Sequence, residues 1–367
     1  MARVVLVDSS AASRRLVRSV LECEHDIETV EEFVDTVGLT QYLLRSMPDL
    51  VLIDSHILSK GGIEVIESIM SETPLPILLL SELDQDAQAS LLLQAMSRGA
   101  LAIESKPSVS DVHGGQSLRA AVRRLMRVPV VHHPRSRPLR VPNVRSVTPG
   151  TLQKREPSSR GSSSIDFANR SIEVVGIGAS AGGPGVVAEI LSALPKEFVA
   201  CVLVVQHLPV GFADHFASFL RVRIQLPVEV PKDTLEIVPG TVIVAPDDAH
   251  LVIGARGRCQ SLHSAAVRGH RPSIDLLFES MARFYGSASI GVVLSGMGSD
   301  GTAGLRAIRR SGGLTVCQDG ESAAVNGMPR AASDSGAAAF RQTPREIIQT
   351  LLRARSRNRE SGGLHGT

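Results

Sequence analysis

The sequence predicts an α/β protein of two units, each built on a mainly parallel sheet. In both halves, short apolar runs alternate with amphipathic helical patterns, which is typical of parallel strands joined by helical crossovers. Between the halves, residues 127–170 are basic and rich in proline and serine and show no periodicity, which is typical of a linker. We therefore expect units at 1–126 and 171–355, this linker between them, and a disordered tail at 356–367.

The composition argues against several classes of protein. No apolar run reaches the roughly 18 residues that a membrane helix needs, and no secretory signal precedes the first strand-like run. The four cysteines are far apart with no CxxC, which argues against zinc and disulfides and for a reducing cytoplasm. Two Tyr, nine Phe and no Trp leave few rings for stacking on bases, so we expect no nucleic-acid partner.

The first unit contains a series of strand-like apolar runs. They are Val4–Val7, Leu50–Ile53, Ile77–Leu80 and Leu101–Ile103. Ser10 can cap a helix that ends at Glu22, and residues 117–126 place apolar side chains on one helical face. This alternation predicts a parallel sheet wound by right-handed crossovers.

Polar side chains follow the strands of this first unit. They are Asp8, Asp54, Ser81 and Lys106. Because parallel strands gather their carboxyl ends along one edge, we expect these groups to cluster there. Such a cluster suits phosphoryl capture: Asp54 could attack phosphorus, Lys106 and a Mg²⁺ ion could hold the transferred oxygens, and Ser81 could bond the product.

The second unit shows the same alternation. Its expected strands are Val174–Ile177, Cys201–Val205, Ile290–Leu294 and Leu314–Cys317, and its expected helices are Val186–Leu194, Ser273–Phe284, Thr302–Ser311 and one that ends near Arg353. The last helix begins with a capping box at Thr343–Glu346. Two further runs, Val242–Ala245 and His250–Ile253, are expected to form a hairpin or an edge pair.

Three strands of the second unit are followed by residues with catalytic chemistry. Ser180 lies in a G-x-S-x-G sequence, whose small neighbours suit a nucleophile on a sharp turn between a strand and a helix. His207 and Asp300 also follow apolar runs. A hydroxyl, an imidazole and a carboxylate at one sheet edge are the parts of a serine hydrolase, with backbone N–H groups at the helix start to stabilise an oxyanion.

Other interpretations remain open for these residues. Gly176, Gly178 and Gly182 are spaced almost like a dinucleotide-binding fingerprint, but an acidic residue is then expected after the next strand, where Gln206 and His207 stand instead. Ser180 could simply cap a helix. A histidine such as His207 is often a structural core residue, and an aspartate in a glycine-rich turn, such as Asp300, is often a cap.

The first unit resembles a response-regulator receiver domain, which has a flavodoxin-like fold. The resemblance rests on PDLVLIDS at 48–55, on the hydroxyl of Ser81 and on the Lys106-Pro107 pair. It implies that Asp54 is the phospho-acceptor, Lys106 senses the phosphate and Ser81 is the switch hydroxyl. It also implies Mg²⁺ at Asp8 and Asp54, and a sensor histidine kinase as phosphodonor.

The first unit departs from the receiver pattern at three places. The family usually has two adjacent acids after the first strand, where this chain has Asp8-Ser9. An aromatic residue is common three positions before the lysine, where Ile103 stands. The proline usual after the phospho-acceptor is absent from DSHILSKGG. Loss of the second carboxylate weakens a site for a hard cation.

The second unit resembles the chemotaxis protein-glutamate methylesterases, the CheB family. The resemblance rests on GASAGGP, QHLP, HRPSID, LSGMGSDGTAGL and QDGESAAVNGMP, spread over about residues 171–340. It implies a doubly wound, mainly parallel α/β methylesterase domain with Ser180 as nucleophile, His207 as general base and Asp300 as the residue that orients it. It also implies that the backbone N–H of Met297 helps to stabilise the oxyanion. Ala181 stands where the family often has a threonine that supports the histidine.

The family resemblance implies hydrolysis of glutamyl methyl esters, and deamidation of glutamines, on the cytoplasmic helices of methyl-accepting chemoreceptors. The esterase needs no cofactor, and the unphosphorylated receiver covers the active site until phosphorylation releases it. Arg268, His270 and Arg271 could contact the acidic receptor helices. Two other functions remain possible: a phosphorylation-controlled adaptor that binds receptors without esterase activity, and a dinucleotide-binding module.

Overall fold

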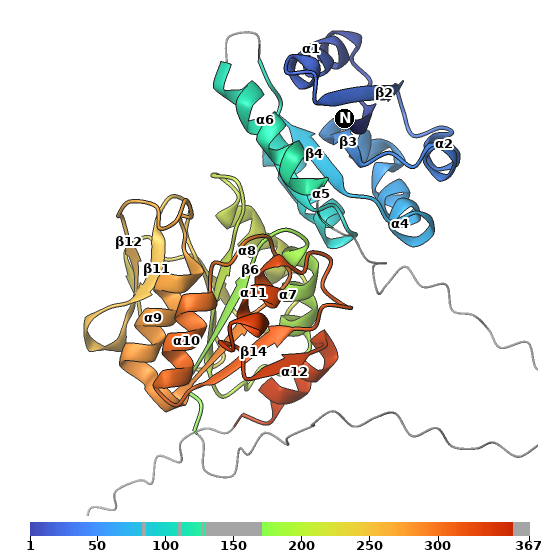
Figure 1. Ribbon diagram of the computed structural model, residues 1–367. Helices are drawn as coiled ribbons and strands as arrows, with labels where there is room; N and C mark the ends of the chain where they lie inside the picture. The colour runs from blue at the N-terminus through green and yellow to red at the C-terminus, as the bar shows by residue number, and fades with distance from the viewer. Residues whose placement is uncertain (83–85, 109–111, 127, 129–170, 355–367) are drawn as a thin grey trace, which may run out of the picture.

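The computed structural model describes residues 1–82, 86–108, 112–126, 128 and 171–354, which form two units in contact (Figure 1). Apart from residue 128, the expected linker at 127–170 lies outside the described residues, as does the expected tail at 356–367.

The first unit is a five-stranded parallel sheet in the order β2-β1-β3-β4-β5. The strands are β1 Ala2–Val7, β2 Ile27–Phe33, β3 Leu50–Asp54, β4 Ile77–Ser81 and β5 Ala102–Ser105; the helices are α1 Ala11–Glu22, α2 Leu39–Ser46, α3 Ser55–Ile57, the π-helical turn η1 Leu58–Gly62, α4 Ile63–Glu72, α5 Asp86–Ser97 and α6 Val112–Leu125. Alternate side chains of each buried strand point to opposite faces. Val4 and Leu6 therefore pack with α1 and α6, whereas Val5 and Val7 pack with α2, α4 and α5.

The second unit is a seven-stranded parallel sheet in the order β15-β14-β13-β6-β7-β10-β8. The strands are β6 Val174–Ala179, β7 Cys201–Gln206, β8 Val228–Glu229, β10 Val242–Val244, β13 Ser289–Val293, β14 Leu314–Gln318 and β15 Phe340–Gln342. The helices are α7 Gly183–Ser192, α8 Ala213–Arg221, α9 Ile274–Tyr285, α10 Thr302–Arg310, α11 Gly327–Asp334 and α12 Pro344–Leu352, with 3-10 turns η3 Ala255–Gly257 and η4 Gly286–Ala288. Helices α7, α8 and α12 pack on one face of this sheet, and α9, α10 and α11 pack on the other. The predicted α/β class with parallel sheets is confirmed for both units.

The hairpin or edge pair expected from Val242–Ala245 and His250–Ile253 is wrong. Strand β10 pairs in parallel with β7 on one side and β8 on the other, so both of its edges are occupied. The chain then turns away at Asp248, which has a φ of 52°. β11 His250–Ile253 belongs to a separate antiparallel sheet in the order β11-β12-β9, with β12 Cys259–Leu262 and β9 Thr234–Leu235.

Helix α9 packs unusually close to strand β6, because β6 carries glycine where the helix crosses it. A Cβ on Gly178 would lie 2.3 Å from a side-chain carbon of Ile274, and one on Gly176 would lie 2.5 Å from the sulfur of Met281. Real Cβ atoms essentially never approach so closely. The two glycines therefore bring the N-terminus of α9 down to the carboxyl end of β6.

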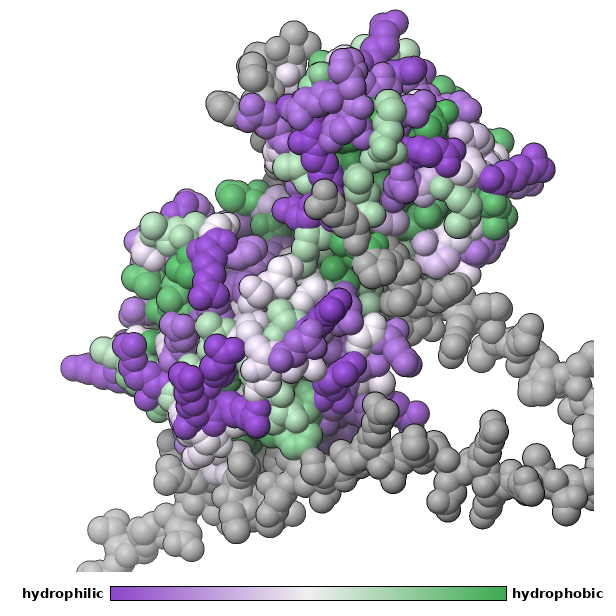
Figure 2. All heavy atoms as spheres, in the orientation of Figure 1, coloured by the Kyte–Doolittle hydropathy of each residue, from purple (hydrophilic) through white to green (hydrophobic). Residues whose placement is uncertain are grey.

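The two units meet through an apolar surface. Helix α5 packs against α7 and α8, and one continuous cluster of buried apolar side chains runs from the first unit into the second. A Cβ on Gly185 of α7 would lie 3.0 Å from the carbonyl oxygen of Ser97 at the end of α5, so the two helices approach closely. Hydrophobic side chains, green in Figure 2, gather between the units. Among the described residues, no helix combines the length and apolar content needed to cross a membrane.

Candidate active site

Ser180 is held by backbone contacts at the carboxyl end of β6. Its N–H donates to the carbonyl of Ser295 at 3.0 Å, and its own carbonyl accepts from the N–H of Gly183 at 2.9 Å. Gly182 takes a φ of 70°, a left-handed conformation that suits glycine and lets the chain turn from β6 into α7. The serine is therefore presented on the sharp turn that the G-x-S-x-G sequence predicted.

His207 and Asp300 are brought together by the strand order. They follow β7 and β13, which flank β6 on its two sides. The ring nitrogen Nε2 of His207 lies 3.0 Å from Oδ2 of Asp300. The backbone N–H of His207 donates to the carbonyl of Ala179, which ties the histidine to the end of β6. This is the sheet edge at which an open α/β sheet binds its ligands.

Asp300 is 4% exposed and is surrounded by hydrogen-bond donors. Besides His207, they are the backbone N–H groups of Ile274, Asp275 and Gly301 and the hydroxyl of Ser273. Burial alone would disfavour the carboxylate, but the hydrogen bond and charge of His207 and the N–H groups at the start of α9 outweigh it. Together they lower the pKa of Asp300 to about 2. Asp300 is therefore ionised at any working pH.

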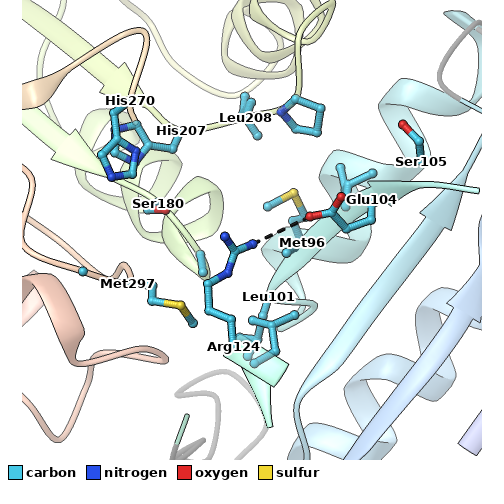
Figure 3. Close-up of a pocket in the computed structure, with 16 residues that line it drawn as sticks. Met96, Leu101, Glu104, Ser105, Arg124, Ser180, His207, Leu208, His270 and Met297 are labelled. Atoms are coloured by element: carbon cyan, nitrogen blue, oxygen red, sulfur yellow. Dashed lines mark ion pairs between the residues drawn. The ribbon is translucent and has the colours of Figure 1, made fainter. Parts of the chain in front are cut away.

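Ser180 and His207 line one cavity, but no hydrogen bond joins their side chains among the described residues. Nδ1 of His207 is buried and has no hydrogen-bond partner within the described part of the chain. With the proton on Nε2 shared with Asp300, this nitrogen carries the free lone pair. In Figure 3, Ser180, His207 and His270 lie on one side of the cavity, with Glu104 and Ser105 of the first unit across from them.

The cavity has a volume of about 480 Å³ and is shared between the two units. The second unit contributes Ser180, Ala181, His207, Leu208, Pro209, His270, Met297 and Gly298, and the first contributes Met96, Leu101, Ala102, Ile103, Glu104, Ser105, Arg124 and Leu125. It therefore joins a reactive wall from one unit to a mainly apolar wall from the other.

Met297 lies on the reactive wall of this cavity, in the glycine-rich turn after β13. Gly296 packs directly against Ser180: a Cβ there would lie 2.8 Å from the serine Cβ. Among the described residues, the backbone N–H of Met297 has no hydrogen-bond acceptor. It is therefore available to a ligand, as an oxyanion donor must be.

His270 lies inside the site, and its neighbouring arginines are held in the surrounding loop. The ring of His270 stacks on that of His207, with centroids 4.3 Å apart and an interplanar angle of 3°. Burial and then the charge of His207 lower the pKa of His270. Arg268 pairs with Asp275 and Arg271 with Asp248. Both arginines remain exposed, and their contact with acidic receptor helices stays a prediction.

A metal centre fits this site poorly. Ligand atoms of His207, His270 and Asp300 lie within 4.8 Å of one another. However, parallel stacked rings do not direct their in-plane lone pairs at one point, and the Asp300 carboxylate is already occupied by N–H and O–H donors. The arrangement favours a hydrogen-bond relay.

The polar residues of the first unit cluster as their strand ends predicted. Nζ of Lys106 lies 3.0 Å from Oδ2 of Asp8 and 2.5 Å from Oδ2 of Asp54, and both carboxylates are 1% exposed. Burial disfavours the charged ammonium of Lys106, but the hydrogen bonds and negative charges of Asp54 and Asp8 favour it more strongly. The pKa of Lys106 is therefore raised. Ser81 is buried at the end of β4, where its carbonyl accepts from the N–H of Lys106.

The first-unit cluster provides oxygen ligands of the type that a hard cation prefers. Asp8 and Asp54 are the carboxylates. In the described ranges, Oδ2 of Asp54 has no hydrogen-bond partner besides its ion pair with Lys106. Ser9 supplies no third carboxylate, and the ring of His56 lies 3.1 Å from Oδ1 of Asp54. Asp8 and Asp54 offer Mg²⁺ two carboxylates, but both oxygens of Asp8 already accept from Ser10, Ser13 and Lys106, so the ion would have to displace some of these donors.

Three supporting residues were not predicted from the sequence. Nε2 of Gln206 donates to the carbonyls of Ser180 and His207, at 2.8 and 3.1 Å, and so links the two turns. The buried hydroxyl of Ser295 donates to Ala181 and accepts from Val325. The hydroxyl of Ser273, expected only at a helix start, both caps α9 and donates to Asp300. Gln206 gave a signal, a polar residue at the end of an apolar strand.

Comparison with known proteins identifies both units. The family described as CheB methylesterase matches residues 175–351, and the response regulator receiver domain matches residues 4–112. Protein-glutamate methylesterase/protein-glutamine glutaminase 3 of Anaeromyxobacter dehalogenans (strain 2CP-C) is 35% identical over 356 residues, which cover 96% of this chain and 98% of that relative. Protein-glutamate methylesterase/protein-glutamine glutaminase 2 of Methanospirillum hungatei JF-1 is 34% identical over 365 residues, 98% of this chain and 100% of that relative.

The crystal structure of the Thermotoga maritima CheB methylesterase catalytic domain is 36% identical to this chain; it covers 50% of this chain and 98% of its own, with a TM-score of 0.48. The relatives above match at about one residue in three over nearly the full length of both chains. The chain therefore belongs to the CheB methylesterase family of ester hydrolases, with a response regulator receiver domain ahead of its hydrolase domain.

Proposed function

We propose that the protein hydrolyses glutamyl methyl esters, and deamidates glutamines, on the cytoplasmic helices of methyl-accepting chemoreceptors. Ser180 Oγ attacks the ester carbonyl while His207 takes its proton, and the imidazolium then protonates the departing methoxide, which leaves as methanol. A water molecule, deprotonated by His207, cleaves the acyl-enzyme and restores Ser180. In deamidation, the same attack on a glutamine releases ammonia.

The His207–Asp300 pair is the observation that carries this proposal. With its Nε2 proton directed at Asp300, the imidazole keeps Nδ1 as a base, and Nδ1 has no competing partner in a site that also contains Ser180. Asp300, held ionised, favours the imidazolium that forms during attack. The hydrogen bond from Ser180 to His207 is expected to form with substrate, since catalytic hydrogen bonds are often long before binding.

The family names support the substrate class. The relatives described above are named for their action on protein glutamate and protein glutamine. A glutamyl methyl ester and a glutamine share the same γ-carbonyl and differ only in the group that leaves it, methoxide or ammonia. The free N–H of Met297 is the proposed oxyanion donor in both reactions.

The receiver domain is the proposed gate of the esterase. Helix α5 of the receiver packs on α7 and α8, and receiver side chains form one wall of the cavity at Ser180. A sensor histidine kinase is the proposed phosphodonor and Asp54 the acceptor. Asp8 and Asp54 would hold Mg²⁺, which compensates the charge of the phosphoryl oxygens, and Lys106 would bind one of those oxygens.

The test is methanol release from a methylated chemoreceptor fragment by the full chain. We expect Ser180→Ala to reduce the rate by about a thousandfold or more, because the nucleophile is lost. A Ser180→Ala protein that releases methanol at the wild-type rate would contradict the proposal and favour the adaptor, which needs no nucleophile. Titration with NAD(P) tests the dinucleotide-binding module: saturable binding would favour it.

A further inference from the structure

The docked receiver leaves Ser180 partly exposed. Ser180, His207 and Met297 are all of intermediate exposure with the receiver in place. They open into the cavity of about 480 Å³ that the two units share. Volumes of about 300–1,000 Å³ are typical of sites for small molecules.

A receptor helix at Ser180 would meet the receiver. An α-helix with side chains is about 10–12 Å across, so a helix that reaches Ser180 needs space along the wall that faces it. A helix that presents a glutamyl ester to Ser180 must also continue in both directions, and receiver residues such as Met96, Leu101 and Leu125 occupy the facing wall. The docked receiver therefore excludes a helix without closing the site to a small ligand.

We infer that the closed protein is a size-selective esterase, which excludes receptor helices but hydrolyses short soluble esters, preferentially those that carry a carboxylate. The inference rests on the proposed function of Ser180 and extends it to a second class of substrate. It follows that the receiver controls which esters reach Ser180 and leaves the catalytic groups themselves unchanged.

The preference for a carboxylate comes from Arg124 of the receiver. Arg124 extends from α6 into the cavity, facing the wall that carries Ser180 (Figure 3). Its pair with Glu104 is long, at 3.7 Å, and burial raises the pKa of Glu104. After burial and the charge of His207, the charge of Arg124 also lowers the pKa of His270, so its field reaches the catalytic wall. The guanidinium has five N–H donors, so it can bind a second anion in the cavity beside Glu104.

The reaction on a small ester balances in the same way as on a receptor. Ser180 Oγ bonds to the carbonyl carbon, the carbon–alkoxide bond breaks, and the alcohol leaves with the proton carried by His207. Water then cleaves the acyl-serine bond, giving the free acid and restoring the hydroxyl. Water is the only co-reactant.

The test compares two small esters with a methylated receptor fragment, using the full chain and assaying methanol. The small esters are the γ-methyl ester of N-acetylglutamate, which keeps its α-carboxylate, and the matched α-amide, which is neutral. The variant Gly185→Leu places a side chain where even a Cβ would lie 3.0 Å from the Ser97 carbonyl, so it separates α7 from α5. Small-angle scattering checks that the units have separated, and acetyl phosphate with Mg²⁺ provides a second route to opening.

We expect opening to raise kcat/KM for the receptor fragment by at least about tenfold, while both small esters change by less than about twofold. A parallel rise for the small esters would show that the docked receiver seals Ser180. If kcat/KM for the receptor fragment did not rise when the units are separated, the closed form would already admit helices. Either result overturns the inference.

Arg124→Gln tests the carboxylate preference in the closed protein. We expect the kcat/KM ratio of the anionic ester to the neutral amide to fall by about threefold, the size of an exposed charge pair. An unchanged ratio would show that Arg124 does not cause the preference for a carboxylate. Ser180→Ala separates the two proposals. If this variant hydrolyses the small esters as fast as wild type, the proposed function fails. If it does not, but opening raises kcat/KM equally for small esters and receptor fragment in the active protein, only the size selection fails.

Discussion

Backbone N–H groups of a helix distant in the sequence hold the carboxylate of Asp300 in place. Its carboxylate accepts from the first N–H groups of α9, a helix that begins 26 residues earlier in the chain, and from the imidazole of His207. N–H groups at a helix N-terminus stabilise an anion. The aspartate is thereby fixed in orientation and in charge, as a residue that orients an imidazole must be.

Asp300→Asn is expected to lower kcat for methanol release by about 10³–10⁴-fold, because the amide no longer favours the required tautomer and imidazolium. Asp275→Asn is the matched control: Asp275 is also buried, but it bonds Gly304 and Arg268 and does not touch His207. We expect the control to keep more than about a tenth of the wild-type kcat. Equal losses in both variants would indicate a structural effect of any buried aspartate.

Asp300 also makes the protein sensitive to acid. Its pKa is lowered from 3.8 to about 2 in the folded state, so it stabilises the fold above about pH 4 and loses that effect as the pH falls towards 2. We expect wild type to be more stable than Asp300→Asn at pH 6, and this advantage to shrink by about 2 kcal/mol at pH 2. Urea unfolding followed by circular dichroism measures it; a gap that does not change with pH would contradict the lowered pKa.

The proposed relay residues could be named from the sequence, whereas the residues that support them could not. Ser180, His207 and Asp300 each follow a continuous apolar strand, and parallel strands end at one edge. Gln206 and Ser295 act by bonding backbone carbonyls of residues far away in the chain, such as Ala181. Every residue has a backbone carbonyl whatever its side chain, so the sequence pattern could not indicate which residues accept these hydrogen bonds.

Among the elements, β6 and α9 determine the geometry of the site. Glycine at positions 176 and 178 lets α9 approach the sheet, and this approach places the first N–H groups of α9 at Asp300. The glycines that resembled a dinucleotide fingerprint thus have a packing role in this fold. Gly178 and Gly182 also form the G-x-S-x-G motif, and Gly182 makes the turn after Ser180.

Gly178→Ala is expected to destabilise the protein by about 1–3 kcal/mol and to lower kcat, because its Cβ would lie 2.3 Å from a carbon of Ile274 and push α9 away from Asp300. Chemical unfolding and methanol release measure the two effects. The double variant Gly178→Ala/Ile274→Ala removes the clash and should recover part of both losses relative to Ile274→Ala alone. Additive losses in the double variant would contradict close packing as the cause.

Strands buried on both faces were predictable, as was the edge strand β5, whereas the edge strands β2, β8 and β15 were not predicted. The predicted strands of the second sheet correspond to β6, β7, β13 and β14, which are fully buried, and the capping box of α12 is present as expected. Strand β2 has the sequence IETVEEF, with exposed acids and only two buried residues, so it lacks the apolar run of a central strand. Strands β8 and β9 have two residues each, too few to show a period.

At the scale of the whole molecule, helix α5 serves two surfaces. Ala89, Leu92, Leu93 and Met96 are buried, and they lie in the cluster that joins the receiver sheet to the hydrolase helices. A helix that is apolar around most of its surface is buried on more than one side. The sequence pattern did not indicate which of these residues face the second unit.

The proposed phosphorylation site of the receiver carries less negative charge than the family pattern, because Ser9 stands where the family has a second acid beside Asp8. Ser9→Asp is expected to tighten Mg²⁺ by about tenfold, the effect of roughly 1.4 kcal/mol of added attraction between an ion and a nearby carboxylate. The Mg²⁺ dependence of labelling by acetyl phosphate measures this change. Unchanged Mg²⁺ dependence would indicate that the ion does not lie beside residues 8 and 9.

The matched control for this labelling is Asp54→Asn, which keeps the shape of the acceptor and removes its nucleophilic oxygen. We expect no label on this variant, with or without Ser9→Asp. Label that persists would mean that another residue accepts the phosphoryl group, and Lys106 would then pair with Asp54 for structural reasons alone.

The central claim is that Ser180, His207 and Asp300 act as one relay, and an active-site-directed fluorophosphonate tests it most directly. The reagent forms a stable adduct only with an activated serine, and intact-mass and peptide mass spectrometry locate it. The account predicts one adduct, at Ser180, with a labelling rate that falls by about a hundredfold or more in His207→Ala. Labelling of Ser180 at the same rate in wild type and His207→Ala, or no adduct in protein that still releases methanol, would contradict it.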